Sequence, residues 1–510
     1  MIWLKKNKVR LLKLSFLLLL SIIFSSGHIE NPDTHLRLTQ SQFLIDNGSF
    51  ALEPGYGDIT HGNIAYNNEG IAYSVYNPGQ ILLFVPLSYL GSFINIQGVD
   101  SYYIIAFMAS FIGYFVYGLL LIVFFNIGVL LKIPIKSIIF SVITFAFTSY
   151  CFSHSQDGYE HIYEALFILL AWLYLLKGRN HEGYKYFLFS SLFIGLGLMF
   201  RTTTLLAVPG IMFLIGSWKY RVLYGLTIIP FILMLLFYNY FRFDNPFDNG
   251  YQKAWELAFN HLGIIGFRLN TLPKHIFGLL IYPGKGLLFF SPSIILGIIG
   301  WQKSSIKEYK LLISVIITVG LYLIIYGANF AWHGSAWSWG PRYIVPIIPL
   351  IYIGLFFFFH STKNLKHIYT FLILISFFIQ ILSVTVYYKR QLVRVYEEHG
   401  DVFWSNDYFF TFKYFPLSEQ TISFIEISES TFNNKKLNLF LPLESWRNES
   451  RPASLSMMLN NSIDFNAYNF WWIRLQYFPF VSPIIKLGAL ILVAISFILF
   501  SIVLILNYKY

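Results

Sequence analysis

The sequence is poor in charged residues and contains a single cysteine. Of its 510 residues, 12% are charged, whereas 56% are hydrophobic and 20% are aromatic. So few charges cannot cover the surface of a soluble chain of this length, which excludes an ordinary water-soluble globular protein. One cysteine, Cys151, also excludes an intramolecular disulfide. We therefore expect most of the chain to lie in lipid and to be held together by helix packing.

Apolar runs of about 20 residues, long enough for a helix to cross a ~30 Å hydrocarbon layer, recur along the chain. The net charge of +11 comes from cations in short clusters between these runs, which indicates topology rather than nucleic-acid binding. The clusters are Lys5–Lys13, Lys132 with Lys136, Lys177–Lys185, Lys219 with Arg221, Lys303–Lys310, Lys363 with Lys366, and Lys509.

If these clusters lie in the cytoplasm, the chain is an all-α polytopic membrane protein with about twelve transmembrane helices and both termini inside. The expected spans are residues 11–27, 101–131, 136–153, 159–176, 186–200, 203–217, 222–238, 284–300, 311–327, 343–360, 367–388 and 483–507.

Two apolar stretches need a separate interpretation. Counting Ile81–Ile96 as a span would reverse the orientation of everything after it, so we expect an interfacial or re-entrant helix there. The first 26 residues have the basic start and apolar middle of a secretory signal, but Phe24–Gly27 lacks a clear small-x-small cleavage site. We therefore expect the first span to be retained.

The predicted outer side carries the long connections. They are residues 28–100, 239–283, 328–342 and 389–482. Within the last of these, the alternating stretches 422–427 and 437–443 predict short strands, and hence a small extracytoplasmic α/β or β segment before the final helix. The expected division of the chain is a transmembrane domain over 1–388 that includes the outer loops 28–100 and 239–283, an extracytoplasmic segment over 389–482, and a last transmembrane helix with a cytoplasmic end over 483–510.

Asp33 is the first candidate functional residue, since it follows the first span directly, with Arg37 close behind. A carboxylate held at the interface can accept the proton of a hydroxyl group that attacks a substrate. The alternative is a solvated acid that caps a helix beginning near Thr34.

A second group of ionisable residues, His154, Asp157, Glu160, His161 and Glu164, recurs at spacings of three and four, as on one helix face. Such residues in a lipid-embedded helix usually face a bundle interior or an aqueous cavity. The alternative is snorkelling to the interface with local ion pairs. The spacing matches no stringent metal motif, so we expect no metal, although a divalent cation is chemically possible.

Cations also occur at the predicted outer headgroup level, at Arg201, Lys274, His275 and Arg342. Fixed cations there can stabilise the charge that develops on a departing phosphate, or can simply bind lipid headgroups. The segment 329–343 adds His333, Trp337 and Trp339 among small residues. We interpret it as a sugar-binding platform, with an interfacial aromatic belt as the alternative.

Six short motifs lie in order on the predicted outer side. They are Asp33 with Arg37, Tyr76–Gln80 before Pro86, Phe200–Thr203, Asn245–Tyr251, Pro283–Leu287 followed by Ser291 and Pro292, and Trp339–Tyr343. In this order they resemble the GT-C superfamily of membrane glycosyltransferases that use polyprenyl-phosphate sugars, which includes the protein O-mannosyltransferases (glycosyltransferase family 39) and the lipid A aminoarabinose transferase.

The resemblance implies that residues 1–388 are a GT-C-like catalytic domain that transfers a sugar with inversion from a polyprenyl-phosphate carrier to an acceptor. Asp33 would be the general base, and Asp157, or Glu160 in its place, the acid of a later span. The remaining candidates would bind substrate: Arg37, Glu160, His161, Arg201, Lys274, His275, His333, Trp337, Trp339 and Arg342. The family often has a second acid close to the first, whereas no acid stands immediately beside Asp33 here, which leaves metal dependence open; we expect no cofactor.

The partners implied are a polyprenyl-phosphate-sugar donor, a glycan, lipid or protein acceptor, and membrane lipid, with no nucleic acid. The site would face the extracytoplasmic side of the inner (cytoplasmic) membrane. Two other classes stay open: a transporter or flippase of lipid-linked sugars, which needs no base beside an acceptor, and a membrane scaffold. Inverted-repeat symmetry would favour the transporter, but no internal repeat is visible.

Overall fold

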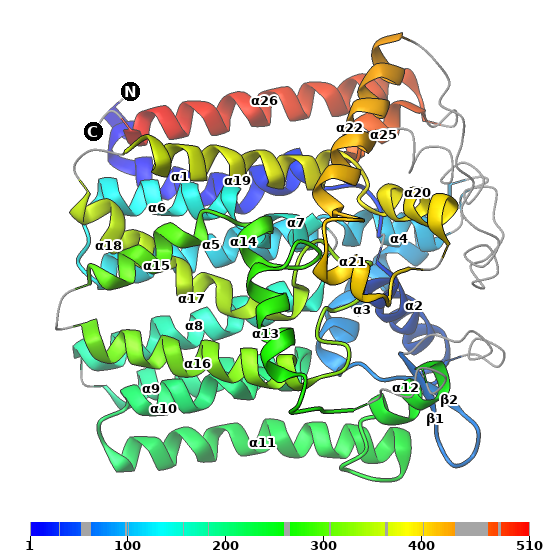
Figure 1. Cartoon of the computed structure of the whole chain (residues 1–510), viewed down its shortest axis with the longest axis horizontal. Helices are drawn as coiled ribbons and strands as arrows, with labels where there is room; N and C mark the ends of the chain where they lie inside the picture. Colours follow the sequence, from blue (N-terminus) through cyan, green and yellow to red (C-terminus); the bar gives the residue numbers. More distant parts are fainter. Residues whose placement is uncertain are drawn as a thin grey trace.

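The computed structural model describes residues 2–29, 31–52, 63–96, 99, 101–156, 158–181, 183–259, 266–304, 308–362, 366–400, 402–433, 468–477 and 481–508. Most of its helices run side by side in one bundle, and both termini lie at the same end (Figure 1).

The bundle is built from long helices and from shorter helical pieces that follow one another. It contains α1 (Ile2–Phe24), α4 (Ser101–Ala109), α5 (Ile112–Leu130), α6 (Ile135–Thr148), α7 (Cys151–Gln156), α8 (Glu160–His181), α9 (Tyr184–Phe200), η2 (Thr202–Ala207), α10 (Val208–Leu214), α11 (Trp218–Phe243), α14 (Leu287–Phe290), α15 (Ile294–Gln302), α16 (Tyr309–Ala328), η5 (Arg342–Ile347), α17 (Ile348–Tyr352), α18 (Gly354–Ser361), α19 (His367–Thr385) and α26 (Pro483–Tyr508).

The remaining elements gather at the end of the bundle away from the termini (Figure 1). They are α2 (Pro32–Asn47), the antiparallel strands β1 (Ile64–Tyr66) and β2 (Ala72–Ser74), α3 (Pro78–Ser92), α12 (Tyr251–Phe259), α20 (Lys389–His399), α21 (Asn406–Phe410), α22 (Pro416–Asn433) and α25 (Trp471–Tyr477). Helix α13 (Leu272–Ile281) lies further along the bundle, beside α14 and α16 (Figure 1). We call this region the cavity end, for the cavity described below.

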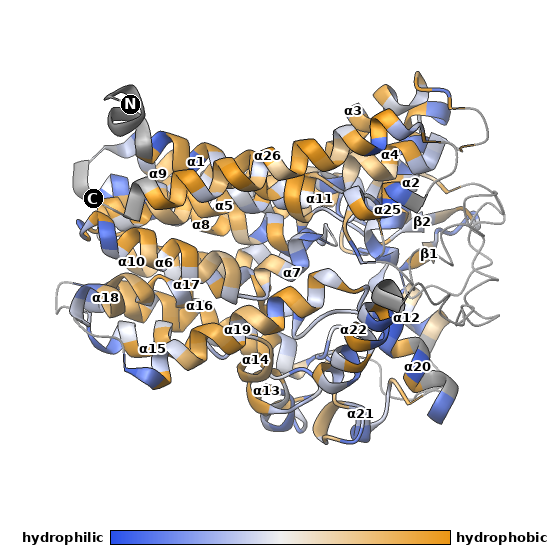
Figure 2. Cartoon of the chain, turned by 90° about the horizontal axis from the view of Figure 1, so that it is seen from above, coloured by the Kyte–Doolittle hydropathy of each residue, from blue (hydrophilic) through white to orange (hydrophobic). Residues whose placement is uncertain are grey.

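Within the described ranges, seven helical stretches are long and apolar enough to cross a membrane, judged by length and composition. They are Ser101–Leu130, Glu160–Arg179, Trp218–Phe243, Tyr309–Ala328, Arg342–Ser361, His367–Thr385 and Pro483–Ile505. Each coincides with one of the predicted spans, and hydrophobic residues cover the bundle along its length (Figure 2). The chain is thus a mostly helical membrane protein, whereas the number twelve stays a prediction.

The predicted interfacial stretch 81–96 lies mainly in α3, at the cavity end beside α2 and α4. A helix of 15 residues is about 22 Å long, which is shorter than the ~30 Å hydrocarbon layer. Its length therefore agrees with a helix that does not cross the membrane, and its place at the interface stays a prediction.

The predicted span 136–153 is interrupted. Helix α6 ends at Thr148, Ser149 is extended with φ −95° and ψ 145°, and α7 ends again at Gln156. Gly158 then adopts a left-handed φ of +64° before α8 begins. The expectation that His154 and Glu160 share one helix face is therefore wrong: they lie on different helices. Asp157, between them, lies outside the described residues.

The predicted strand over 422–427 is also wrong, because these residues belong to α22. The buried positions of this helix include Gln420, Ser423 and Ile427, which are spaced by three and four as on one helix face. Two of these buried positions are polar. Together with the apolar residues between them, they produce an alternation of apolar and polar residues that is typical of a strand. The other predicted strand, 437–443, lies outside the described residues, and the described part of 389–482 contains the helices α20, α21, α22 and α25.

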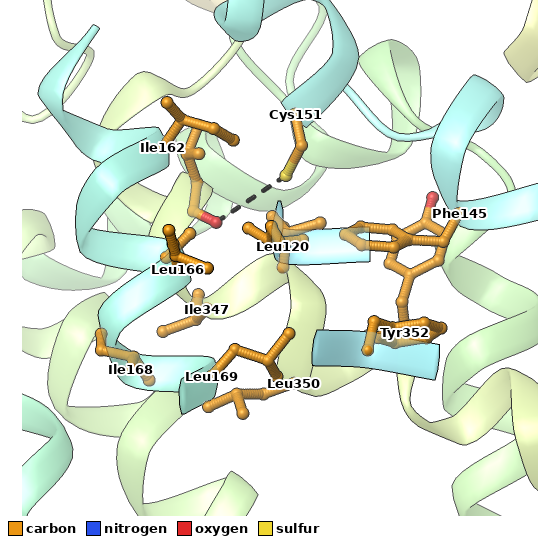
Figure 3. Packing of buried hydrophobic residues seen from close by; sticks show 14 of the residues in the cluster. Leu120, Phe145, Cys151, Ile162, Leu166, Ile168, Leu169, Ile347, Leu350 and Tyr352 are labelled. Carbon is orange, nitrogen blue, oxygen red and sulfur yellow. Dashed lines mark hydrogen bonds between the residues drawn. The ribbon is translucent and has the colours of Figure 1, made fainter. Parts of the chain in front are cut away.

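The bundle core surrounds α8, which packs against α5, α9 and η5. Figure 3 shows Cys151 of α7 in this core among Leu120, Leu166 and Ile347, and its sulfur lies 4.0 Å from the carbonyl oxygen of Val345. Close packing of α5 on α7 depends on Gly113, where an added Cβ would lie 1.9 Å from a backbone oxygen of Ser155. This packing fixes the start of α8, which carries Glu160, at the cavity end.

Candidate active site

A cavity of about 780 Å³ opens at the cavity end of the bundle. Residues from α2, α8, η2, α12, α16 and η5 form its wall, together with Asn63 before the hairpin and Tyr76 and Asn77 after it. It brings together five residues that the sequence analysis singled out, from three different helical elements and the C-cap of α9. They are Asp33, Arg37, Glu160, Arg201 and Arg342.

Asp33 lies in the first turn of α2, and its side chain is 8% exposed. The helix is capped by Asn31, whose side-chain oxygen accepts a hydrogen bond from the backbone N–H of Thr34 at 2.6 Å, so the alternative interpretation of Asp33 as the helix cap is wrong. Instead, Oδ2 of Asp33 lies 2.9 Å from Nη1 of Arg342, and Oδ1 accepts a hydrogen bond from Asn63 at 3.2 Å. The carboxylate is thus held at the cavity wall by partners from distant parts of the chain.

Glu160, at the start of α8, binds two guanidinium groups with its two oxygens. Oε2 lies 2.9 Å from Nη1 of Arg37, and Oε1 contacts Nη1 of Arg201. Burial alone would lower the pKa of Arg37, but the neighbouring Glu160 carboxylate raises it above its ordinary value. Arg37 therefore stays charged, and its guanidinium lies 3.6 Å from the ring centroid of Tyr76.

Arg201 also contacts a second carboxylate, one turn further along α8. Its Nε lies 3.2 Å from Oε2 of Glu164, and its Nη2 donates to the hydroxyl of Tyr326 at 2.9 Å. Glu164 in turn accepts hydrogen bonds from Thr203 at 2.8 Å and from Tyr322 at 2.6 Å. Arg201 is thereby fixed on three sides, although its side chain is still 13% exposed.

The loop before η5 sets the position of Arg342. Gly334 has a φ of +67°, and a Cβ added there would lie 2.6 Å from Cγ of Arg342, so only glycine leaves room for this side chain. The buried Lys285 donates to the carbonyl oxygen of Ser338 at 2.5 Å, and Nε2 of His154 lies 2.8 Å from the carbonyl oxygen of Trp339. The loop is thus anchored from two other parts of the bundle.

The other predicted substrate-binding residues do not line the cavity. His161 is buried behind Glu160, with its Nδ1 4.0 Å from that carboxylate. Nδ1 of His275 lies 2.8 Å from the carbonyl oxygen of Gly327, whereas Lys274 donates to the side chain of Asn406. Their binding roles stay predictions.

The aromatic platform expected at 329–343 is used largely for packing. His333 stacks on Phe409 with ring centroids 4.0 Å apart, and Trp339 meets Phe290 edge to face at 5.1 Å. Trp337 packs 6.1 Å from Phe403. None of His333, Trp337 and Trp339 contributes to the cavity wall as described, so a direct contact with a ligand in this cavity would require rearrangement of the loop.

Sequence reasoning missed several lining residues, among them Asn63, Trp255 and Tyr326. Tyr251 ends one of the six motifs and does line the cavity, and Trp255 lies one turn further along α12, a helix that the sequence analysis did not predict. Asn63 and Tyr326 carry no comparable signal, because nothing near them in the sequence indicates that the chain turns back to Asp33 and Arg201.

The sequence matches no protein-family model and no curated protein. Three solved structures resemble its fold. The oligosaccharyltransferase of Archaeoglobus fulgidus, tethered to an acceptor peptide with the NVT sequon, has a TM-score of 0.48 and 12% identity, over 80% of this chain and 59% of that one. The archaeal oligosaccharyltransferase AglB from the same organism, in complex with an inhibitory peptide and a dolichol-phosphate, has a TM-score of 0.47 and 12% identity, over 78% and 58%.

ArnT from Cupriavidus metallidurans, bound to undecaprenyl phosphate, has a TM-score of 0.40 and 11% identity, over 86% of this chain and 81% of that one. The present chain thus spans less than two thirds of the length of the two archaeal structures. All three belong to the GT-C superfamily that the sequence motifs resemble.

Proposed function

We propose that this protein is a membrane glycosyltransferase that moves a sugar from a polyprenyl-phosphate carrier to an acceptor hydroxyl, with inversion at the sugar carbon. The observation that carries the proposal is the placement of Asp33. Its carboxylate lies at the wall of the cavity, oriented by Arg342 and Asn63, within a group that also holds Arg37 and Arg201. A base and several cations in one cavity are the groups that such a displacement uses.

In the proposed step, the acceptor oxygen forms a bond to the anomeric carbon while the bond between that carbon and the phosphate oxygen breaks. Asp33 takes the acceptor proton, and the polyprenyl phosphate leaves with the electron pair of the broken bond. Arg201 and Arg342 are the cations assigned to the phosphate, because their side chains are 13% and 12% exposed, whereas Arg37 is 2% exposed. Arg37 instead holds Glu160, which holds Arg201.

We assign no cofactor to this step. Among the described residues, no three His, Cys, Asp or Glu side chains gather as metal ligands would. Asp157, the second predicted catalytic acid, lies outside those residues, and its role stays part of the proposal.

The proposal places the cavity on the extracytoplasmic side of the inner membrane. Both termini lie at the opposite end of the bundle (Figure 1), and the cationic clusters of the sequence assign that end to the cytoplasm.

The test is transfer from a radiolabelled polyprenyl-phosphate-sugar pool by membranes that contain matched amounts of the native chain or Asp33→Asn. We expect the variant to lose at least about 100-fold in rate, the contribution of a general base. Asp46→Asn is the matched control, because it makes the same change at an exposed position of the same helix and should transfer at the native rate. Equal transfer by Asp33→Asn would remove Asp33 as the base, and no transfer by the native chain would favour a flippase of lipid-linked sugars.

A further inference from the structure

The inner and outer parts of the cavity differ in charge. The inner part holds the charged side chains, Asp33 and the arginines among them, which are at most 13% exposed. The more exposed part of the wall is lined by the neutral groups Asn249, Tyr251, Gln252 and Trp255, and the buried Asn329 also lines the cavity. Of the described residues in the outer wall, Glu256 alone is charged. An anionic ligand group is therefore stabilised beside the arginines, and the described lining residues around Trp255 offer it no cation.

Helix α12 determines which groups line the mouth. Tyr251, Gln252, Trp255 and Glu256 are spaced so that they lie on adjoining faces of the helix and line the cavity. Ala254 lies on another face and is fully buried in the cluster formed with the β1–β2 hairpin. Because the hairpin holds that face, the rotation of α12 about its axis is fixed.

Two of the aromatic residues of α12, Tyr251 and Trp255, form a braced surface. The ring centroids of Tyr251 and Trp255 are 5.4 Å apart with an interplanar angle of 56°, and Phe330 supports Trp255 edge-on at 5.0 Å. Trp255 is partly exposed. Burial raises the pKa of Tyr251 to about 12, so its hydroxyl stays protonated and can donate a hydrogen bond. Partly exposed, braced rings offer apolar faces to a ligand at little cost in conformational entropy.

Three amide side chains of the cavity wall keep both donors and acceptors available. Asn249 and Asn329 each use their oxygen to accept a backbone hydrogen bond, from Tyr251 at 3.2 Å and from Ala331 at 2.7 Å. Gln252 uses its nitrogen to donate to Glu256 at 2.9 Å. In the part of the chain that the structure describes, this leaves the nitrogens of both asparagines and the oxygen of Gln252 without a hydrogen-bond partner.

A phosphate group would require donors and cations, and an ammonium group would require acceptors alone. Neutral donors and acceptors match the hydroxyl groups of a ligand ring, and the aromatic side chains match its apolar faces. We propose that the mouth of the cavity, around Trp255, is a binding subsite for an uncharged sugar ring. This subsite deepens the proposed function. It rests on that function only for the source of the sugar ring, which is either the acceptor glycan or the sugar of the donor.

The binding test needs no catalytic activity. Saturation-transfer difference NMR on the purified full-length protein would use methyl glycosides of glucose, galactose, mannose, N-acetylglucosamine and arabinose as probes. We expect Trp255→Ala to weaken binding of the preferred sugar about tenfold, the value of one stacked ring. Trp255→Phe keeps an aromatic face and should lose less than Trp255→Ala. Trp218→Ala is the matched control, because this exposed tryptophan begins α11 at the far end from the cavity.

The source of the ring follows from steady-state transfer kinetics with the same variants. A KM for acceptor that rises in Trp255→Ala while kcat is kept assigns the ring to the acceptor, and a raised KM for donor assigns it to the donor sugar. Both outcomes support the subsite. The inference is overturned if sugar binding does not depend on Trp255 for any sugar of the panel and both KM values of Trp255→Ala match the native ones. In that case, loss of transfer in Asp33→Asn would still support the proposed function.

Discussion

At the scale of single residues, Arg201 depends on a partner that lies outside the cavity wall. Glu164 is fully buried and holds Nε of Arg201, while Thr203 and Tyr322 donate to its other oxygen. We expect Glu164→Gln to remove the charge on this side of Arg201 and to raise the KM for the polyprenyl-phosphate donor about tenfold, the value of one charged hydrogen bond. Transfer kinetics at varied donor concentration measure this, with kcat changed much less than KM.

Tyr322→Phe is the control for this prediction. It removes one hydrogen bond to Glu164 but leaves the carboxylate beside Arg201, so the KM for donor should change less than in Glu164→Gln. If both variants retain the native KM while only thermal stability falls, Glu164 is structural and does not act through Arg201.

The candidate site residues differ in how far the sequence predicts them. Asp33, Arg201 and Arg342 are charged residues at the ends of apolar stretches, so their cost in lipid predicts that they meet in a polar site. Trp337 and His333 have equally suggestive neighbours, yet they pack against Phe403 and Phe409. The partners of an aromatic side chain lie far away in the sequence, and local composition does not determine them.

At the scale of elements, one glutamine joins the ends of three segments. The Nε2 atom of Gln156, the last residue of α7, shares its two N–H groups among the carbonyl oxygens of Phe24, Val384 and Asn469, at 2.9, 3.1 and 3.0 Å. Phe24 ends α1, Val384 lies in the last turn of α19, and Asn469 precedes α25. This amide therefore fixes the part of 468–477 next to the first helix, and Trp471 adds a hydrogen bond to the backbone of Ile22 at 2.6 Å.

We expect Gln156→Leu to leave these buried carbonyl groups without a donor and to lower the free energy of unfolding by on the order of 2 kcal/mol. Thermal unfolding of the detergent-solubilised protein, followed by size-exclusion chromatography, measures the loss. Gln302→Leu makes the same change at an exposed position at the end of α15 and should unfold like the native chain. A native melting temperature for Gln156→Leu would mean that water satisfies the carbonyl groups.

Elements were predictable where hydrophobicity decides them. The long apolar helices follow from length and composition, because lipid requires every backbone group to be paired within the helix. The break between α6 and α7 did not follow, since Ser149 lies in an apolar run and its extended backbone depends on the packing around Tyr150 and Cys151. Helix α22 was mistaken for a strand because its buried face contains Gln420 and Ser423.

At the scale of the whole molecule, the two ends of the bundle are distinct. Residue 69 is exposed in the turn of the hairpin at the cavity end, and residue 302 is exposed at the end of α15, next to the predicted cytoplasmic cluster at Lys303. The single native cysteine, Cys151, is 0% exposed in the folded chain. Cysteines introduced at these two positions therefore report orientation against a silent background.

We expect a membrane-impermeant maleimide to label Glu69→Cys on intact spheroplasts, because the cationic clusters place the cavity end outside. Gln302→Cys should react only after the membrane is permeabilised, and the native chain should not react in either state while it remains folded. The reverse pattern would place the cavity in the cytoplasm and overturn the proposed orientation. In the proposed function, the polyprenyl phosphate binds at the leaflet that faces the cavity. The same result would then also determine on which side of the membrane the donor sugar must be presented.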